Sequence, residues 1–279
     1  MIHLESESPA QAASDIRRQG YEASNVLGSG LGLVDRFNAY LTWAARATAQ
    51  LAQHLDHRQL NELVTTPRYW SLQGVEPIAY GPALSEVLNN ELIARQAALD
   101  AAAQEIDAAV QKWGRYSAVV LDTNVFLEIW DLVERINWNR KLGEFPHVPI
   151  ALVLTSKMLE EIDNLKDRAP SQAARRRARE ATKYLENEFP RGQFRQLRGE
   201  AWGDMESALG WVLHLDALEH QPLPKADSEI LSQALKIRPY AAGIAIASND
   251  SNMRFTARSY NLTAFTVNAD EVLPDSAVQ

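Results

Sequence analysis

The sequence predicts an α/β fold, a mostly parallel sheet with helices on both faces, preceded by an α-helical N-terminal region. Two observations lead to this prediction. Between residues 115 and 270, short apolar runs typical of buried strands alternate with amphipathic stretches typical of helices. Residues 1–114 show helical periodicity without such runs. We therefore expect a helical hairpin over 1–114 and an α/β domain over 115–279.

The composition is that of an ordinary globular protein, with 279 residues, 46% of them hydrophobic and 23% charged. The chain has no cysteine, which excludes disulfides and thiol-based zinc sites. It has no apolar run long enough to predict a transmembrane helix. Its start, MIHLESESPAQAASD, lacks the basic residues and apolar core of a secretory signal. We expect a cytoplasmic protein.

The first part of the N-terminal region is predicted to be irregular. Residues 1–30 are polar and end in the glycine-rich run VLGSGLG, so we expect a flexible entry segment. Apolar residues then recur every three to four positions over residues 31–56, which predicts an amphipathic helix. A shorter helix is expected over residues 58–65, ending before a proline.

The second part of this region is predicted to be a loop followed by a long helix. Residues 67–82 contain three prolines and two glycines, which favours an irregular connection. Pro82 suits the first turn of a helix, and the apolar spacing continues to about Trp113. His54 and His57 stand near a helix end without other metal-ligating residues, so we expect both on the surface.

The α/β domain is predicted to contain alternating strands and helices. Strands are expected in SAVVLDTNV (117–125), an apolar run that leads into a polar turn, and over 148–155, 192–197, 211–215, 242–248 and 262–267. Helices are expected over 125–138, from Ser156 onward, and over 171–188, 226–237 and 251–260. Because right-handed crossovers through helices connect parallel strands, this order predicts a mostly parallel sheet covered on both faces.

Four acidic residues stand at transitions from predicted strands to the helices that follow them: Asp122, Glu161, Asp227 and Asp250. Each aspartate could simply cap the helix that follows it, and Glu161 could be a solvated helix residue. The carboxyl ends of parallel strands, however, share one edge of the sheet, where ligands bind in such folds. Four carboxylates at one edge repel one another unless cations neutralise them. Oxygen ligands without cysteine or nearby histidine favour Mg²⁺ or Mn²⁺.

A basic segment follows the second of these acids. Between Lys166 and Arg198 there are ten lysines and arginines against four acids, a local charge of +6 in a chain of net charge −8. Such a segment is either a solvated helix face or a surface that contacts phosphates. The centre of the segment consists of Arg175, Arg176, Arg177 and Arg179.

Four segments of the chain resemble, in order, the four motifs of PIN-domain ribonucleases. They are LDTNVFL (121–127), TSKMLEEIDNLK (155–166), ADSEILSQAL (226–235) and IAIASNDSNMRFTA (244–257). The likeness is closest to the longer PIN domains with an LEELD-like second motif. It covers residues 115–270, implies a PIN-like sheet there, and leaves residues 1–114 unassigned.

The resemblance implies a set of catalytic residues that also ligate Mg²⁺ or Mn²⁺, namely Asp122, Glu161, Asp227 and Asp250. Glu160 is the alternative to Glu161 in the second motif. Asn124 and Ser248 match polar positions of the family and are expected, with the four arginines, to bind substrate. Asn252 stands where some members have a further acid.

The implied activity is hydrolysis of RNA phosphodiester bonds by an endonuclease that uses a metal-activated water, leaving 5′-phosphate and 3′-hydroxyl ends. An RNA-binding or scaffold protein with a PIN fold and little turnover is the alternative. An aspartate-nucleophile phosphatase is disfavoured, because Asn124 replaces the second aspartate of that motif. A homo-oligomer, or a regulatory partner bound through the N-terminal helices, stays open, as does the identity of the RNA.

Overall fold

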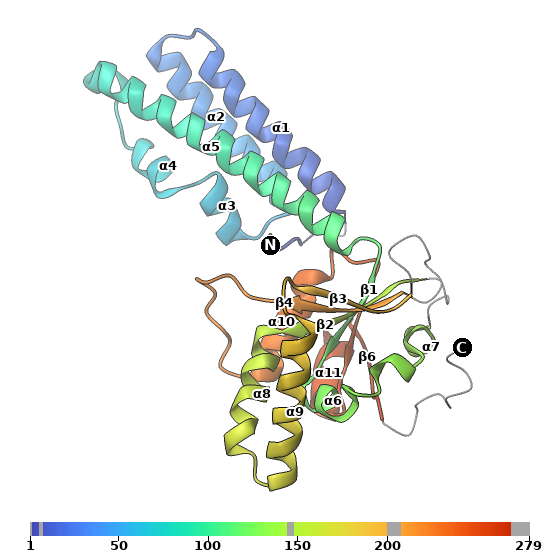
Figure 1. Ribbon diagram of the computed structural model, residues 1–279. Coiled ribbons are helices and arrows are strands. Elements are labelled where there is room, and N and C mark those ends of the chain that lie inside the picture. The colour runs from blue at the N-terminus through green and yellow to red at the C-terminus, as the bar shows by residue number, and fades with distance from the viewer. Residues whose placement is uncertain (1, 6–7, 144–147, 200–207, 269–279) are drawn as a thin grey trace. The chain divides into compact units, whose positions relative to one another are not determined.

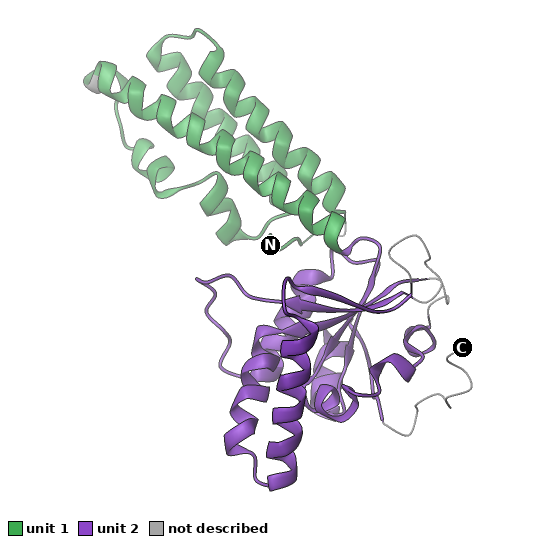
Figure 2. Ribbon diagram, in the orientation of Figure 1, with its two compact units in different colours: residues 1–112 green, residues 113–279 purple. Residues whose placement is uncertain are grey.

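The computed structural model describes residues 2–5, 8–143, 148–199 and 208–268 (Figure 1). The chain folds as two compact units, residues 1–112 and 113–279, which Figure 2 colours separately. Among the described residues, no helix has both the length and the apolar character needed to cross a membrane.

The first unit consists of helices. They are α1 (Pro9–Gly28), α2 (Leu33–Leu51), α3 (His57–Leu63), α4 (Pro67–Leu72) and α5 (Pro77–Trp113). The three long helices α1, α2 and α5 lie side by side (Figure 1) and bury their apolar stripes against one another. The backbone of α5 is broken at Gly81, whose φ of 44° lies in the left-handed region, and the helix resumes at Pro82 as predicted.

The prediction that residues 1–30 are flexible is wrong, because α1 occupies most of them. Its buried stripe includes the polar residues Asp15 and Gln19, which made the segment look solvent-exposed. Asp15 accepts a hydrogen bond at 2.9 Å from His54 and pairs with Arg18, while Gln19 bonds to Gln50. This unit therefore has three long helices rather than the two of a hairpin.

Two further predictions for the first unit are corrected. His54 is not on the surface: it is 4% exposed, because its ring nitrogen pairs with the buried Asp15. His57 is exposed as expected. Residues 67–82 are not all loop, since α4 starts at Pro67 and α5 at Pro77; the short helix before them, α3, ends before Pro67 as predicted. Thr66 caps α4 by accepting a hydrogen bond from a backbone amide of its first turn.

The second unit is built on a six-stranded sheet. Its strands are β1 (Ser117–Leu121), β2 (Ile150–Thr155), β3 (Phe194–Arg198), β4 (Leu209–His214), β5 (Gly243–Ala247) and β6 (Thr263–Phe265). Their order in the sheet is β3-β4-β2-β1-β5-β6. Every neighbouring pair is parallel except β3 and β4. The predicted mostly parallel α/β sheet is confirmed.

Helices cover both faces of this sheet (Figure 1). They are α6 (Thr123–Ile129), the 3₁₀ turn η1 (Val133–Arg135), α7 (Trp138–Leu142), α8 (Ser156–Arg168), α9 (Gln172–Glu188), α10 (Ala226–Ile237) and α11 (Ser251–Ser259). The single helix predicted over 125–138 is interrupted. Trp138 folds back into the core and donates a 2.9 Å hydrogen bond to the carbonyl of Val133, while Asn137 caps α7.

The parallel arrangement determines where the polar residues gather. Strands β1 and β2 are buried along their whole length, and β5 continues the register on the other side of β1. Because β1, β2, β4 and β5 run in the same direction, the segments that follow them emerge at one edge of the sheet. All four predicted acids belong to these segments.

Candidate functional site

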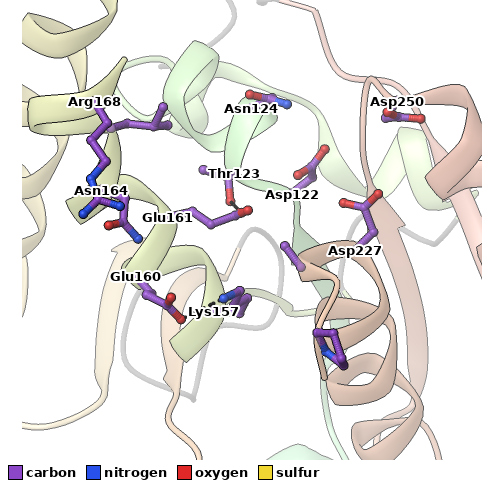
Figure 3. A pocket seen from close by; sticks show the side chains of 13 residues that line it. Asp122, Thr123, Asn124, Lys157, Glu160, Glu161, Asn164, Arg168, Asp227 and Asp250 are labelled. Carbon is purple, nitrogen blue, oxygen red and sulfur yellow. Dashed lines mark hydrogen bonds and ion pairs between the residues drawn. The ribbon is translucent and has the colours of Figure 1, made fainter. Parts of the chain in front are cut away.

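A cavity of about 560 Å³ opens at this carboxyl edge of the sheet (Figure 3). The acids predicted from the sequence all line it: Asp122, Glu161, Asp227 and Asp250. They come from four different segments, the ends of β1 and β5 and the first turns of α8 and α10. The fold therefore brings together residues that are up to 128 positions apart in the sequence.

Asp122 is the most buried of these acids, with 5% of its surface exposed. It precedes α6, but apart from the bond with the Thr123 amide its side chain makes no N-cap hydrogen bond to the described residues of that helix. Its carboxylate instead accepts a 2.8 Å hydrogen bond from Ser248 Oγ, and its backbone amide donates to the carbonyl of Ala247. Capping therefore does not explain this aspartate.

The electrostatic environment of Asp122 disfavours its ionised form. Burial raises the pKa of its carboxyl, and the nearby carboxylates of Asp227 and Glu161 raise it further. Hydrogen bonds from Ser248 and from the Thr123 amide lower the pKa, but the net shift is upward. A bound cation would reverse this penalty, because it favours the ionised carboxylate.

The second motif presents Glu161, and not Glu160, to Asp122. Thr155 caps α8, and the buried Met158 and Ile162 set the rotation of the helix. Glu161 then accepts a hydrogen bond from Thr123 Oγ1 and points toward Asp122 in Figure 3. Glu160 lines the cavity farther away and pairs with Lys157 at 2.9 Å.

The remaining two aspartates differ in what they bond to. Asp227, in the first turn of α10, is exposed and lies beside Asp122 (Figure 3); α10 has no side-chain cap among the described residues. Asp250 does cap α11, because its Oδ1 accepts hydrogen bonds from the backbone amides of Asn252 and Met253. The other oxygen of Asp250 takes no part in this cap.

The polar companions of the acids have separate positions. Asn124 is exposed on the cavity wall. Ser248, which was expected to bind substrate, is fully buried; it donates a hydrogen bond to Asp122 and accepts a 3.0 Å hydrogen bond from the Asp250 amide. Asn252 is not among the residues described as lining the cavity.

None of the predicted arginines lines the cavity in the described part of the chain: Arg175, Arg176, Arg177 and Arg179. Arg176 pairs with Glu180 at 2.8 Å, and Arg179 pairs with Asp167 at 3.4 Å. Arg177 pairs with Asp131 at 2.8 Å and stacks over the ring of Trp130. Three of the four thus have partners within the protein.

Four polar residues that line the cavity were missed by the sequence reasoning: Thr123, Lys157, Asn164 and Arg168. A signal for three of them is present, since Lys157, Asn164 and Arg168 lie four residues before and three and seven residues after Glu161. On a helix these positions share one face. Thr123 follows Asp122 directly, and nothing in its neighbourhood predicts its bond to Glu161.

The donor set suits a hard divalent cation, because carboxylate and amide oxygens line the cavity without cysteine or histidine. Among the described residues, the three acidic or histidine side chains whose ligand atoms lie within 4.8 Å of one another are Asp216, His220 and Glu229. The buried Glu229 of that group already accepts hydrogen bonds from His220, Gln233 and the Leu223 amide. Although burial raises the pKa of Glu229, these bonds hold it below its usual value. These hydrogen bonds hold the segment before α10 against the helix, which is a structural role.

Comparison with known proteins agrees with the site. The family model described as the PIN domain matches residues 119–268, more than half of the chain and all four acids. No curated protein matches the chain. PIN domains are commonly nucleases and typically use divalent metals. The match confirms the resemblance found in the sequence, and the chain belongs to the PIN-domain family.

Proposed function

We propose that the second unit is a Mg²⁺- or Mn²⁺-dependent ribonuclease that hydrolyses RNA phosphodiester bonds. The observation that carries this proposal is the burial of Asp122 next to two further carboxylates. Such an arrangement costs free energy in the absence of a cation and becomes favourable when one binds. Family membership supports a nuclease in general terms, and the cytoplasm is the expected location.

The residues of the cavity divide into ligands and positioning groups. Asp122, Glu161, Asp227 and Asp250 are the proposed ligands. Ser248 orients Asp122, and Thr123 orients Glu161 through its hydroxyl. A divalent ion held by these residues would supply a water of lowered pKa and neutralise charge on the phosphate. Asn124, on the cavity wall, is proposed to contact substrate, and the arginines of α9 are proposed to contact RNA outside the cavity.

The proposal predicts metal-dependent cleavage that requires Asp122. Purified protein is incubated with a mixed RNA pool in Mn²⁺, in Mg²⁺ and in chelator. The Asp122→Asn variant should lose cleavage, because the amide removes a ligand charge while keeping the shape. Asp163→Asn is the matched control, since Asp163 is exposed on α8 and pairs with Lys166 away from the cavity.

The outcomes separate the proposal from its alternative. Cleavage that persists in chelator, or in Asp122→Asn, would contradict the metal-dependent mechanism. RNA binding without cleavage by the wild-type protein would favour an RNA-binding protein with little turnover.

A further inference from the structure

One wall of the cavity is a single face of α8. Lys157, Glu161, Asn164 and Arg168 all line the cavity, and their spacing places them on that face. Arg168 is seven residues beyond Glu161, about 10 Å along the helix. In Figure 3, Asn164 and Arg168 lie on the α8 side, away from Asp227 and Asp250. The cavity thus extends from the carboxylates toward the end of α8.

At the α8 end of the cavity, Asn164 and Arg168 carry N–H groups that can donate hydrogen bonds. Asn164 and Arg168 are exposed, and neither side chain makes a hydrogen bond or ion pair with another described residue. The other cation described on the cavity wall, Lys157, is paired with Glu160. Most of the nearby arginines of α9 are also paired within the protein. Arg168 therefore has its whole guanidinium group open to a ligand.

The charge distribution restricts which part of an RNA chain could sit at Arg168. The cavity wall otherwise carries the four proposed ligand acids and Glu160, which repel phosphate when no cation is bound. A guanidinium group binds phosphate through parallel N–H donors. In Figure 3, the Arg168 side chain lies beside Asn164, on the far side of Glu161 from Asp122, Asp227 and Asp250. This position suits a phosphate next to the one under attack.

We propose that Arg168 binds a backbone phosphate adjacent to the cleaved one, so that the RNA strand leaves the carboxylates along α8 past Asn164. This inference rests on the proposed ribonuclease function and adds a substrate-positioning residue to it. It accounts for an open guanidinium in a mostly acidic cavity. It also predicts that binding depends on the length of the RNA, because a dinucleotide with one phosphate has none left for Arg168.

The test compares full-length wild-type protein with Arg168→Ala, Arg168→Lys and the control Arg46→Ala. Arg46 is also exposed and unpaired among the described residues, but it belongs to α2 in the other unit. Cleavage of a single-stranded RNA decamer in Mn²⁺ should show KM raised about tenfold in Arg168→Ala, with kcat little changed. The salt dependence of log(kcat/KM) should become shallower by about 0.7.

The remaining variants and substrates supply the contrasts. Arg168→Lys should keep the salt dependence of the wild type and bind more tightly than Arg168→Ala, since lysine retains the charge but lacks the paired N–H donors of the guanidinium group. Arg46→Ala should match the wild type. On a dinucleotide, Arg168→Ala should also match the wild type, because no second phosphate is present. If Arg168→Ala lost the same fraction of kcat/KM on the dinucleotide as on the decamer, the proposal would be overturned, since the loss would then come from a general structural defect.

A binding measurement separates this inference from the proposed function. Fluorescence anisotropy of a labelled, non-hydrolysable analogue of the decamer in Mn²⁺ reports affinity without turnover, with the cation present that offsets the charge of the acids. If Arg168→Ala weakens binding about tenfold and the wild type never cleaves, the ribonuclease proposal fails while the phosphate contact stands. If the wild type cleaves and Arg168→Ala leaves KM and affinity unchanged, the contact is wrong. A wild-type protein that does not bind the decamer would also overturn it.

Discussion

Replacing Ser248 by alanine tests how the buried carboxylate of Asp122 is held. The side chain of Ser248 is 0% exposed, and its hydroxyl donates to Asp122 at 2.8 Å and accepts from the Asp250 amide at 3.0 Å. Alanine removes both hydrogen bonds but leaves every acid of the cavity in the chain. The variant therefore separates the positioning of a ligand from its presence.

The expected effect on metal binding follows from these contacts. Removing a group that orients a metal ligand typically lowers metal affinity 10–100-fold, which corresponds to about 1.4–2.7 kcal/mol. The Ser248 hydrogen bond also lowers the pKa of Asp122, so its loss should raise that pKa further. Protons then compete more strongly with the metal. The deficit should be larger in mildly acidic than in mildly alkaline buffer.

Calorimetric titration of Mn²⁺ into the wild type and the variants measures this affinity. Ser248→Thr keeps the hydroxyl and should retain most of the affinity. Ser251→Ala is the matched control, because Ser251 is exposed and its side chain makes no hydrogen bond among the described residues. A Ser248→Ala affinity within about twofold of the wild type at both pH values would refute the reasoning.

Three further predictions concern the acids and the boundary of the unit. In chelator, Asp122→Asn should melt at a higher temperature than the wild type. Burial and neighbouring acids raise the pKa of Asp122 in the folded protein, so the metal-free wild type should lose stability as the pH rises above 3.8 through that raised pKa. Melting curves recorded across this pH range should show no such loss in the variant. Glu161→Gln should impair cleavage while Glu160→Gln is nearly silent; the reverse result would identify Glu160 as the ligand. A fragment of residues 113–279 should bind Mn²⁺ and cut RNA, and a fragment without the 1% exposed Trp113 should melt at a lower temperature. If the longer fragment bound no metal, the assignment of the nuclease activity to the second unit would be contradicted.

The α/β architecture could be predicted from the sequence because its signals are local. The apolar runs at β1, β2 and β5 are continuous, as expected for strands buried on both faces. The position of an acid at the end of a parallel strand also has a general consequence, since such ends share one edge. For this reason Asp122, Asp227 and Asp250 could be predicted to meet from their places in the chain alone.

Other features depended on partners that are distant in the sequence. Helix α1 was missed because the buried Asp15 is satisfied by His54, 39 residues later. The partners of the α9 arginines could not be read from the sequence either, and the structure pairs three of them with Asp131, Asp167 and Glu180. A charge or a buried polar group has a role only in relation to its neighbours in space.

Neighbours in space also decided the different roles assigned to Ser248 and Arg168. From the sequence, Ser248 was expected to bind substrate and Arg168 was one basic residue among ten. Tertiary structure buries the serine against Asp122 and leaves the arginine open on the cavity wall. Periodicity along a chain determines which residues share a helix or strand face, but only the packing of those elements decides which of them are covered.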